Sequence, residues 1–127
     1  DSARSLAEAV DVLIIATPGG PTTDKLVDAE VLAALGPDGV LINIARGGVV
    51  DEDALIAALT EDRLFGAGLD VFAHEPNVPQ TLLDHSRCVL TPHVGSATVE
   101  TRAAMAGLVV ENLLAVLSAR PAITPVG

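Results

Sequence analysis

Short apolar runs that alternate with helical segments constrain the fold of this chain more than any other feature of its sequence. The run Val12 to Ala16 is continuously apolar and rich in β-branched residues, and Val40 to Ile44 has the same character. Such runs are typical of strands buried on both faces, and the helical segments between them connect parallel strands. We therefore expect an α/β fold whose parallel sheet is covered on both sides.

Residues that stop or start regular structure set the bounds of the expected elements. Asp28 to Leu35 has apolar residues at helical spacing and stops at Gly36, and Asp51 can cap the helix that follows the second strand. Thr17 to Pro21 breaks any regular element after the first strand. The remaining expected elements are strands over Ala67 to Phe72 and Cys88 to Leu90, a helical turn over Thr81 to Asp84, and a long helix that opens at Ser96 or Thr98 and reaches about Ala119.

Composition excludes several classes of protein and partner. The 127 residues are 50% hydrophobic, which suits one folded domain and not a disordered chain. The net charge is -10 and Lys25 is the only lysine, so we expect no binding of nucleic acid or of an anionic membrane surface. The longest apolar stretch, Ala103 to Val110, is too short to cross a bilayer. A single cysteine, Cys88, gives no disulfide and no metal-ligand spacing, which suggests a reducing, cytoplasmic setting and no metal site.

Three charged or titratable residues follow the ends of successive expected strands. Arg46 comes after the second strand, Glu75 after the third and His93 after the fourth. Ligands of open parallel sheets bind beyond the carboxyl ends of the strands, so these residues are candidates for a site. Taken singly, each is more often an exposed or structural loop residue. The functional interpretation depends on the three together.

Together these residues supply what the reduction of a carbonyl group requires. Arg46 offers a planar, permanently charged fork for a substrate carboxylate. His93 has an ordinary pKa of about 6.5, and a neighbouring carboxylate such as Glu75 is expected to raise it, so the imidazole could donate a proton at cellular pH.

Three stretches of the chain resemble the signature motifs of the D-isomer specific 2-hydroxyacid dehydrogenase family. They occur in the family's order and spacing, and the resemblance covers nearly the whole chain from Ala9 onward. The stretches are Asn43-Ile44-Ala45-Arg46-Gly47-Gly48-Val49-Val50-Asp51-Glu52-Asp53-Ala54-Leu55, then Gly68-Leu69-Asp70-Val71-Phe72 with Glu75-Pro76, then Thr91-Pro92-His93-Val94-Gly95-Ser96-Ala97-Thr98.

The resemblance implies an oxidoreductase that moves a hydride between NAD or NADP and a small 2-oxo acid, with a D-2-hydroxy acid as the product. Arg46 would bind and polarise the substrate, His93 would be the general acid, and Glu75 would hold the imidazole. The loop Thr17 to Pro21 is similar to versions in glyoxylate and hydroxypyruvate reductase-like members. The residues that match the family's cofactor pocket are Thr17, Pro18, Thr23, Ile44, Ala45, Arg46, Asp70, His93, Val94, Gly95 and Ser96, with Asp70 near the nicotinamide carboxamide.

The chain departs from the family because it has no Gly-x-Gly-x-x-Gly turn and no ribose-reading residue downstream of one. We therefore expect part of a Rossmann-type doubly wound sheet that lacks its first strands. Residues 1–119 would be the carboxyl-terminal portion of the NAD(P)-binding domain with its long exit helix, and residues 120–127 would return to a missing substrate domain. The fragment alone is expected to be inactive, and the full-length protein, with its missing N-terminal part, to be a homodimer.

Two other functions stay open at this point. A non-enzymatic NAD-binding scaffold or corepressor-like protein could keep the same fold and the same three residues. A truncated, inactive reading frame would have no upstream sequence that encodes the glycine-rich turn. The identity of the 2-hydroxy acid and the choice between NAD and NADP depend on residues that this chain does not contain.

Overall fold

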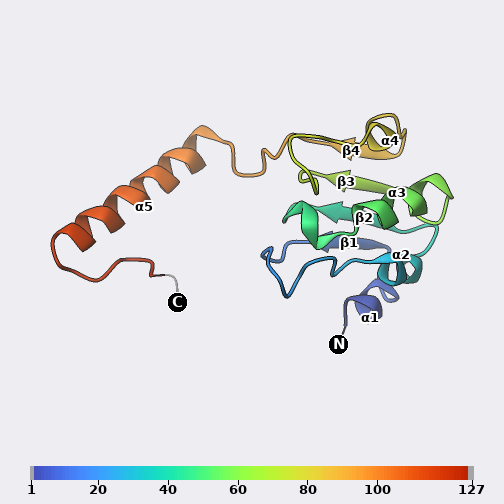
Figure 1. Cartoon of the computed structure of the whole chain (residues 1–127), viewed down its shortest axis with the longest axis horizontal. Coiled ribbons are helices and arrows are strands. Elements are labelled where there is room, and N and C mark those ends of the chain that lie inside the picture. Colours follow the sequence, from blue (N-terminus) through green and yellow to red (C-terminus); the bar gives the residue numbers. More distant parts are fainter. Residues whose placement is uncertain (1, 126–127) are drawn as a thin grey trace. The chain divides into compact units, whose positions relative to one another are not determined.

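A computed structural model describes residues 2–125 and divides the chain into two compact units (Figure 1). Unit 1 is Asp1–His93 and unit 2 is Val94–Gly127. Unit 1 contains the sheet and the residues singled out at the strand ends. Each unit is described by itself.

Unit 1 is built on a parallel sheet of four strands in the order β1-β2-β3-β4. The ladder is in register: Ile15 lies opposite Asn43, Asn43 opposite Leu69, and Leu69 opposite Leu90. All four strands therefore end at one edge of the sheet, and the expected α/β class is confirmed. The strands are β1 (Val12–Ile15), β2 (Val40–Asn43), β3 (Gly66–Leu69) and β4 (Cys88–Leu90).

Three strands end before the expected residue: β1 ends at Ile15, one residue early, and β2 and β3 end early for local reasons. β2 ends at Asn43 because the side chain of Asn43 accepts the N–H of Ala45, at 3.0 Å, and turns the backbone. β3 ends at Leu69, well before Phe72, because the N–H of Phe72 donates to the carboxylate of Glu75, at 3.0 Å, and not to a neighbouring strand.

The helices begin at the capping residues that the sequence offers. Asp28 accepts the N–H groups of Glu30 and Val31, both at 3.0 Å, and Asp51 accepts that of Ala54, at 3.3 Å. Gly36, with φ of 82°, ends the first of these two helices. The helices of unit 1 are α1 (Ala3–Ala7), α2 (Ala29–Leu35), the 3-10 turn η1 (Gly47–Val49), α3 (Glu52–Thr60) and α4 (Gln80–Leu83).

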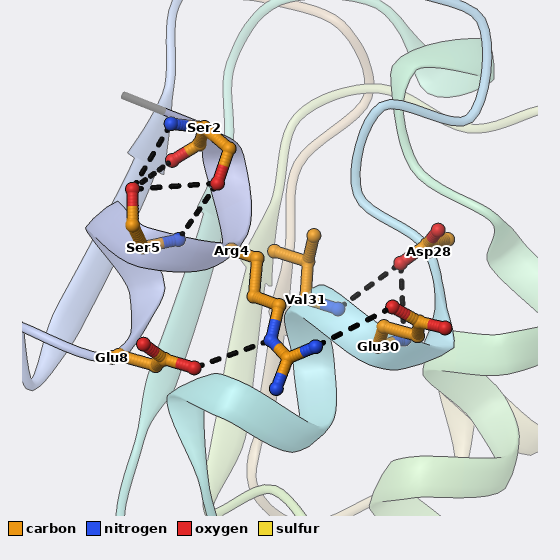
Figure 2. Close-up of polar contacts among 7 residues, drawn as sticks. All are labelled: Ser2, Arg4, Ser5, Glu8, Asp28, Glu30 and Val31. Atoms are coloured by element: carbon orange, nitrogen blue, oxygen red, sulfur yellow. Dashed lines mark hydrogen bonds and ion pairs between the residues drawn. The ribbon is translucent and has the colours of Figure 1, made fainter.

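Helix α1 was not expected from the sequence. A capping box between Ser2 and Ser5 starts it, as Figure 2 shows. Arg4 then lies between Glu8, at 3.2 Å, and Glu30 of α2, at 3.7 Å, so its side chain links the two helices (Figure 2).

One face of the sheet is buried and the other is open in the described residues. Leu13 and Leu41 are at most 4% exposed and share one hydrophobic core with Leu32 of α2. On the other face, Ile14 is 57% exposed and Val89 is 70% exposed. The prediction of a sheet covered on both sides is therefore wrong for the described part of the chain, because the helices of unit 1 belong to a single core.

Unit 2 is the long helix α5 (Val99–Leu117) and the segment after it. Thr98 caps the helix through the N–H of Thr101, at 3.2 Å, which decides between the two expected starts. The helix ends near the expected Ala119, where φ is 54° and the chain turns back. Most of its large apolar side chains are exposed, including Leu117 at 82%. None of the described helices meets the length and hydropathy needed to cross a bilayer.

Strand β1 is an open edge of the sheet, and this predicts self-association of the isolated chain. A hollow of about 690 Å³ between α1 and β1 is lined mostly by apolar residues, Ile14 among them. Unpaired strand edges with apolar side chains pair with other chains. We expect the 127-residue chain to elute from size-exclusion chromatography as dimers or larger species, and Ile14→Lys to shift it toward the monomer.

Ala33→Lys is the control, because it adds the same charge at an exposed position of α2. It should leave the elution volume unchanged. A compact monomer for the unaltered chain over a wide range of concentrations would contradict the expectation.

Candidate active site

Arg46, Glu75 and His93 all follow strands at the same edge of the sheet. Arg46 begins the η1 turn after β2, Glu75 lies on the turn after β3, and His93 follows β4 (Figure 1). The in-register ladder places these strand ends side by side. The structure thus gives the three residues the common location that the sequence analysis required.

His93 and Glu75 are in direct contact through their side chains. Nδ1 of His93 lies 2.8 Å from Oε2 of Glu75, and Oε1 of Glu75 accepts the N–H of Phe72 at 3.0 Å. Both carboxylate oxygens are therefore engaged, and Nε2 is the ring nitrogen left to exchange a proton with a substrate. The side chains are 45% and 36% exposed, so a ligand can reach them.

Glu75 is held in its ionised form. Its hydrogen bond with His93 lowers its pKa most, and the hydrogen bond from the N–H of Phe72 lowers it further. Partial burial opposes this shift, while the positive charges of His93 and Arg46 add to it. A carboxylate at this distance orients the imidazole through Nδ1.

The backbone of His93 adopts a conformation that is uncommon for residues other than glycine. Its φ is 52°, in the left-handed region, and its N–H donates to the carbonyl oxygen of Thr91 at 3.0 Å. Thr91 is held in turn by two hydrogen bonds. Its hydroxyl donates to Oδ1 of Asp70, and its N–H donates to the carbonyl oxygen of Leu69. Conformations of this kind persist where the surroundings determine them, and they concentrate at functional sites.

Asn43 anchors the turn that carries Arg46. The residue Asn43 is 1% exposed, and Nδ2 of its side chain donates to the carbonyl oxygen of Arg46 at 3.0 Å. The guanidinium of Arg46 also folds back, with Nη1 donating to the carbonyl oxygen of Ala45 at 2.6 Å. The sequence analysis did not give Asn43 a role, although a polar residue at the end of an apolar run was a signal for one.

Two further contacts hold the turn after β3 against the segment that follows β2, one at the Arg46 turn and one at the start of α3. A Cβ on Gly47 would lie 1.9 Å from the carbonyl oxygen of Phe72, so only glycine allows this close approach. Oε2 of Glu52, at the start of α3, accepts the N–H of Ala73 at 3.0 Å. The sequence analysis read Glu52 only as an acidic residue in the first turn of a helix.

The expected cofactor residues fall into distinct structural settings. Ile44 is 55% exposed, whereas Ala45 is buried and can offer only its backbone to a ligand. The hydroxyl of Thr23 donates to Pro18 and to Gly20, at 2.8 and 3.2 Å, so it closes its own loop. Of the remaining expected residues, Thr17 is half-buried in unit 1, Asp70 is 8% exposed, and Val94, Gly95 and Ser96 belong to unit 2.

The residues of unit 1 fit one end of a nicotinamide cofactor. Ile44 presents an exposed apolar side chain one residue after β2, and Asp70, one residue after β3, is a mostly buried carboxylate that could accept from an amide group. The chain carries no glycine-rich turn of the kind that receives the pyrophosphate. In residues 2–125, no cluster of His, Cys, Asp and Glu could hold a metal ion.

A family model matches residues 1–95 of this chain, and its description is "D-isomer specific 2-hydroxyacid dehydrogenase, NAD binding domain". The chain is 55% identical over 125 residues to hydroxyphenylpyruvate reductase of Plectranthus scutellarioides, a match that covers 98% of the chain and 40% of that protein. It is 56% identical over 121 residues to a glyoxylate/hydroxypyruvate reductase A of Arabidopsis thaliana, covering 95% of the chain and 39% of that protein.

Solved structures show the same relationship. The NADPH-dependent glyoxylate/hydroxypyruvate reductase of Sinorhizobium meliloti, solved in complex with NADP and malonate, superposes with a TM-score of 0.97 at 55% identity. The match covers 99% of this chain and 40% of that one. The chain thus spans about 40% of the length of the relatives that it matches.

The lowered pKa of Glu75 predicts how Glu75→Gln changes the pH dependence of stability. Because the folded-state pKa lies below the unfolded value, the ionised carboxylate contributes stability that is fully present above the unfolded value of about 4.3 and is lost as pH falls through the folded value. We expect the variant to lose up to about 1 kcal/mol in the free energy of unfolding near neutral pH.

The difference between wild type and Glu75→Gln should shrink as the solution is acidified, as measured by urea unfolding at a series of pH values. Glu111→Gln, which removes an exposed carboxylate on α5, is the control and should change the free energy of unfolding less. A Glu75→Gln deficit that stays constant into the acid range would contradict the assignment.

Proposed function

The chain belongs to the D-isomer specific 2-hydroxyacid dehydrogenase family, and we propose that it forms part of an enzyme that reduces a small 2-oxo acid to a D-2-hydroxy acid with NADH or NADPH. The hydrogen bond of 2.8 Å between Glu75 and His93, at the sheet edge where Arg46 also follows a strand, is the observation that carries this proposal.

Each of the three side chains has one task in the proposed reaction. Nε2 of His93 donates a proton to the carbonyl oxygen of the substrate and takes it back in the reverse direction. Glu75 holds the ring through Nδ1, which leaves Nε2 to face the substrate. The guanidinium of Arg46 binds the substrate carboxylate and polarises the adjacent carbonyl group.

The nicotinamide cofactor, when bound, supplies the hydride that the carbonyl carbon accepts. We assign Thr17, Pro18, Thr23, Ile44, Ala45 and Asp70 of unit 1 to contacts with it. The exposed side chain of Ile44 and the carboxylate of Asp70 at the same sheet edge support this assignment. Val94, Gly95 and Ser96 of unit 2 are assigned to the cofactor only because they match the family motif that begins at Thr91. The NADPH-dependent relative from Sinorhizobium meliloti favours NADPH.

The substrates that fit the proposal best are glyoxylate and hydroxypyruvate. Both are small 2-oxo acids, and two of the relatives reported above are named glyoxylate/hydroxypyruvate reductases. A carboxylate next to a carbonyl group is the pattern that Arg46 and His93 would recognise. The alternative of a non-enzymatic scaffold gains no support, because those relatives are named as reductases.

The organisation of the whole protein is part of the same proposal. Residues 1–119 would belong to the cofactor domain and residues 120–127 would return to the substrate domain, with residues 126 and 127 outside the described ones. The exposed apolar side chains of β1 and α5 support a larger protein that covers them, with a second copy in a homodimer. A single cysteine suits a cytoplasmic location.

His93→Ala in the full-length enzyme tests the proposed chemistry. Loss of a general acid lowers the rate by about 10²- to 10⁴-fold, so we expect kcat for hydroxypyruvate reduction to fall within this range in a steady-state assay. His74→Ala, which alters an exposed histidine next to Glu75, is the control and should stay close to wild type. A loss of less than about tenfold for His93→Ala would refute the role of His93.

The 127-residue chain by itself should have negligible activity. It contains no glycine-rich turn to receive the pyrophosphate of the cofactor, so the cofactor would not be held over the site. NADPH oxidation with glyoxylate or hydroxypyruvate is the measurement, with the full-length enzyme as the positive control. Turnover by the isolated chain above that of buffer would count against this expectation.

A further inference from the structure

The loop over residues 17–23 lies against the side chain of Arg46 through Gly19. A Cβ on Gly19 would lie 2.8 Å from Cγ of Arg46 and 3.0 Å from its Cβ, distances that demand a shift of one partner. A Cβ on the neighbouring Gly20 would meet no atom within 4 Å. Neither glycine has a φ in the left-handed region, so contact with Arg46 is what distinguishes them.

The loop is held from within and from its end. The hydroxyl of Thr23 donates to the carbonyl oxygens of Pro18 and Gly20, and the N–H of Thr23 also donates to Gly20, at 3.0 Å. Two residues further on, the N–H of Lys25 donates to the carbonyl oxygen of Gly48, at 2.8 Å. These bonds resist any lifting of the loop away from the Arg46 turn.

Arg46 is held from the other side. Its backbone is anchored by Asn43, and the next residue, Gly47, fits closely against another turn. A methyl group on Gly19 would press on the root of the Arg46 side chain, at Cβ and Cγ, and not on its flexible end. The side chain would have to change its rotamer, which moves the guanidinium.

We propose that Gly19 is a positioning residue for the 2-oxo acid: because it has no side chain, the loop over residues 17–23 seats Arg46 where its guanidinium receives the substrate carboxylate. This inference rests on the proposed function, since that function makes the carboxylate the partner of Arg46. The inference gives the loop over residues 17–23 a role in substrate affinity, although the sequence predicted that this loop lies on the cofactor side.

The test compares Gly19→Ala with Gly20→Ala in the full-length enzyme. A displacement of a binding group by about 1 Å can cost about 10²-fold, so we expect Gly19→Ala to raise KM for hydroxypyruvate at least about tenfold, with a smaller change in kcat. The Kd of oxalate for the NADPH-loaded enzyme, measured by calorimetry, should rise by a similar factor. The Kd of NADPH for Gly19→Ala should match the wild-type value. For Gly20→Ala, kcat, KM and both Kd values should match those of the wild type.

A double-mutant cycle shows whether Gly19 acts through Arg46. In the Arg46→Ala background, Gly19→Ala should cause no further loss of oxalate affinity, because the guanidinium is already absent. If Gly19→Ala alone fails to fold, recovery of folding in the double variant supports the inference, and failure of the double variant overturns it.

Two other results overturn the role of Gly19. One is equal behaviour of the Gly19→Ala and Gly20→Ala variants, and the other is an additive loss in the Arg46→Ala background. These results leave the proposed function intact if the unaltered enzyme reduces 2-oxo acids. An unaltered enzyme that neither reduces a 2-oxo acid nor binds oxalate overturns the proposed function and the role of Gly19 together.

Discussion

The in-register parallel ladder is the constraint on which the site depends. Asn43, Leu69 and Leu90 lie in one row across three strands, so the chain leaves each strand at the same edge. Parallel pairing requires a long connection between strands, and those connections carry the helices of the single core. The turns that follow the strands then need only a few residues to bring an arginine, a carboxylate and an imidazole to one place.

Backbone contacts between the turns give this place its rigidity. Asn43 ties the Arg46 turn to β2, and Glu52 ties the turn after β3 to the start of α3. Gly47 lets two backbones approach more closely than any side chain would permit. Neighbouring residues therefore fix the positions of the turns that carry Arg46 and Glu75. General acid catalysis requires reacting groups that are held in place in this way.

The described residues expose apolar surfaces, as expected for a chain that covers only part of the length of its relatives. The edge strand β1 and the helix α5 expose large apolar side chains, among them Ile14 and Leu117. Exposed apolar area of this kind is characteristic of surfaces that another segment or molecule covers. Because the chain covers only about 40% of the length of the relatives, the segments that cover these surfaces in a longer protein explain the exposure.

The sequence by itself determined the type and order of most elements, and it singled out Arg46, Glu75 and His93, because apolar periodicity and capping residues act over a few neighbouring positions. Short helix α1, the end of β3 and the open second face of the sheet were not predictable in this way. Asn43 as an anchor and Gly19 as a contact of Arg46 were decided only by the tertiary structure. Both depend on where the β2 turn and a separate loop meet in space, and no local pattern encodes a distance between atoms of different segments.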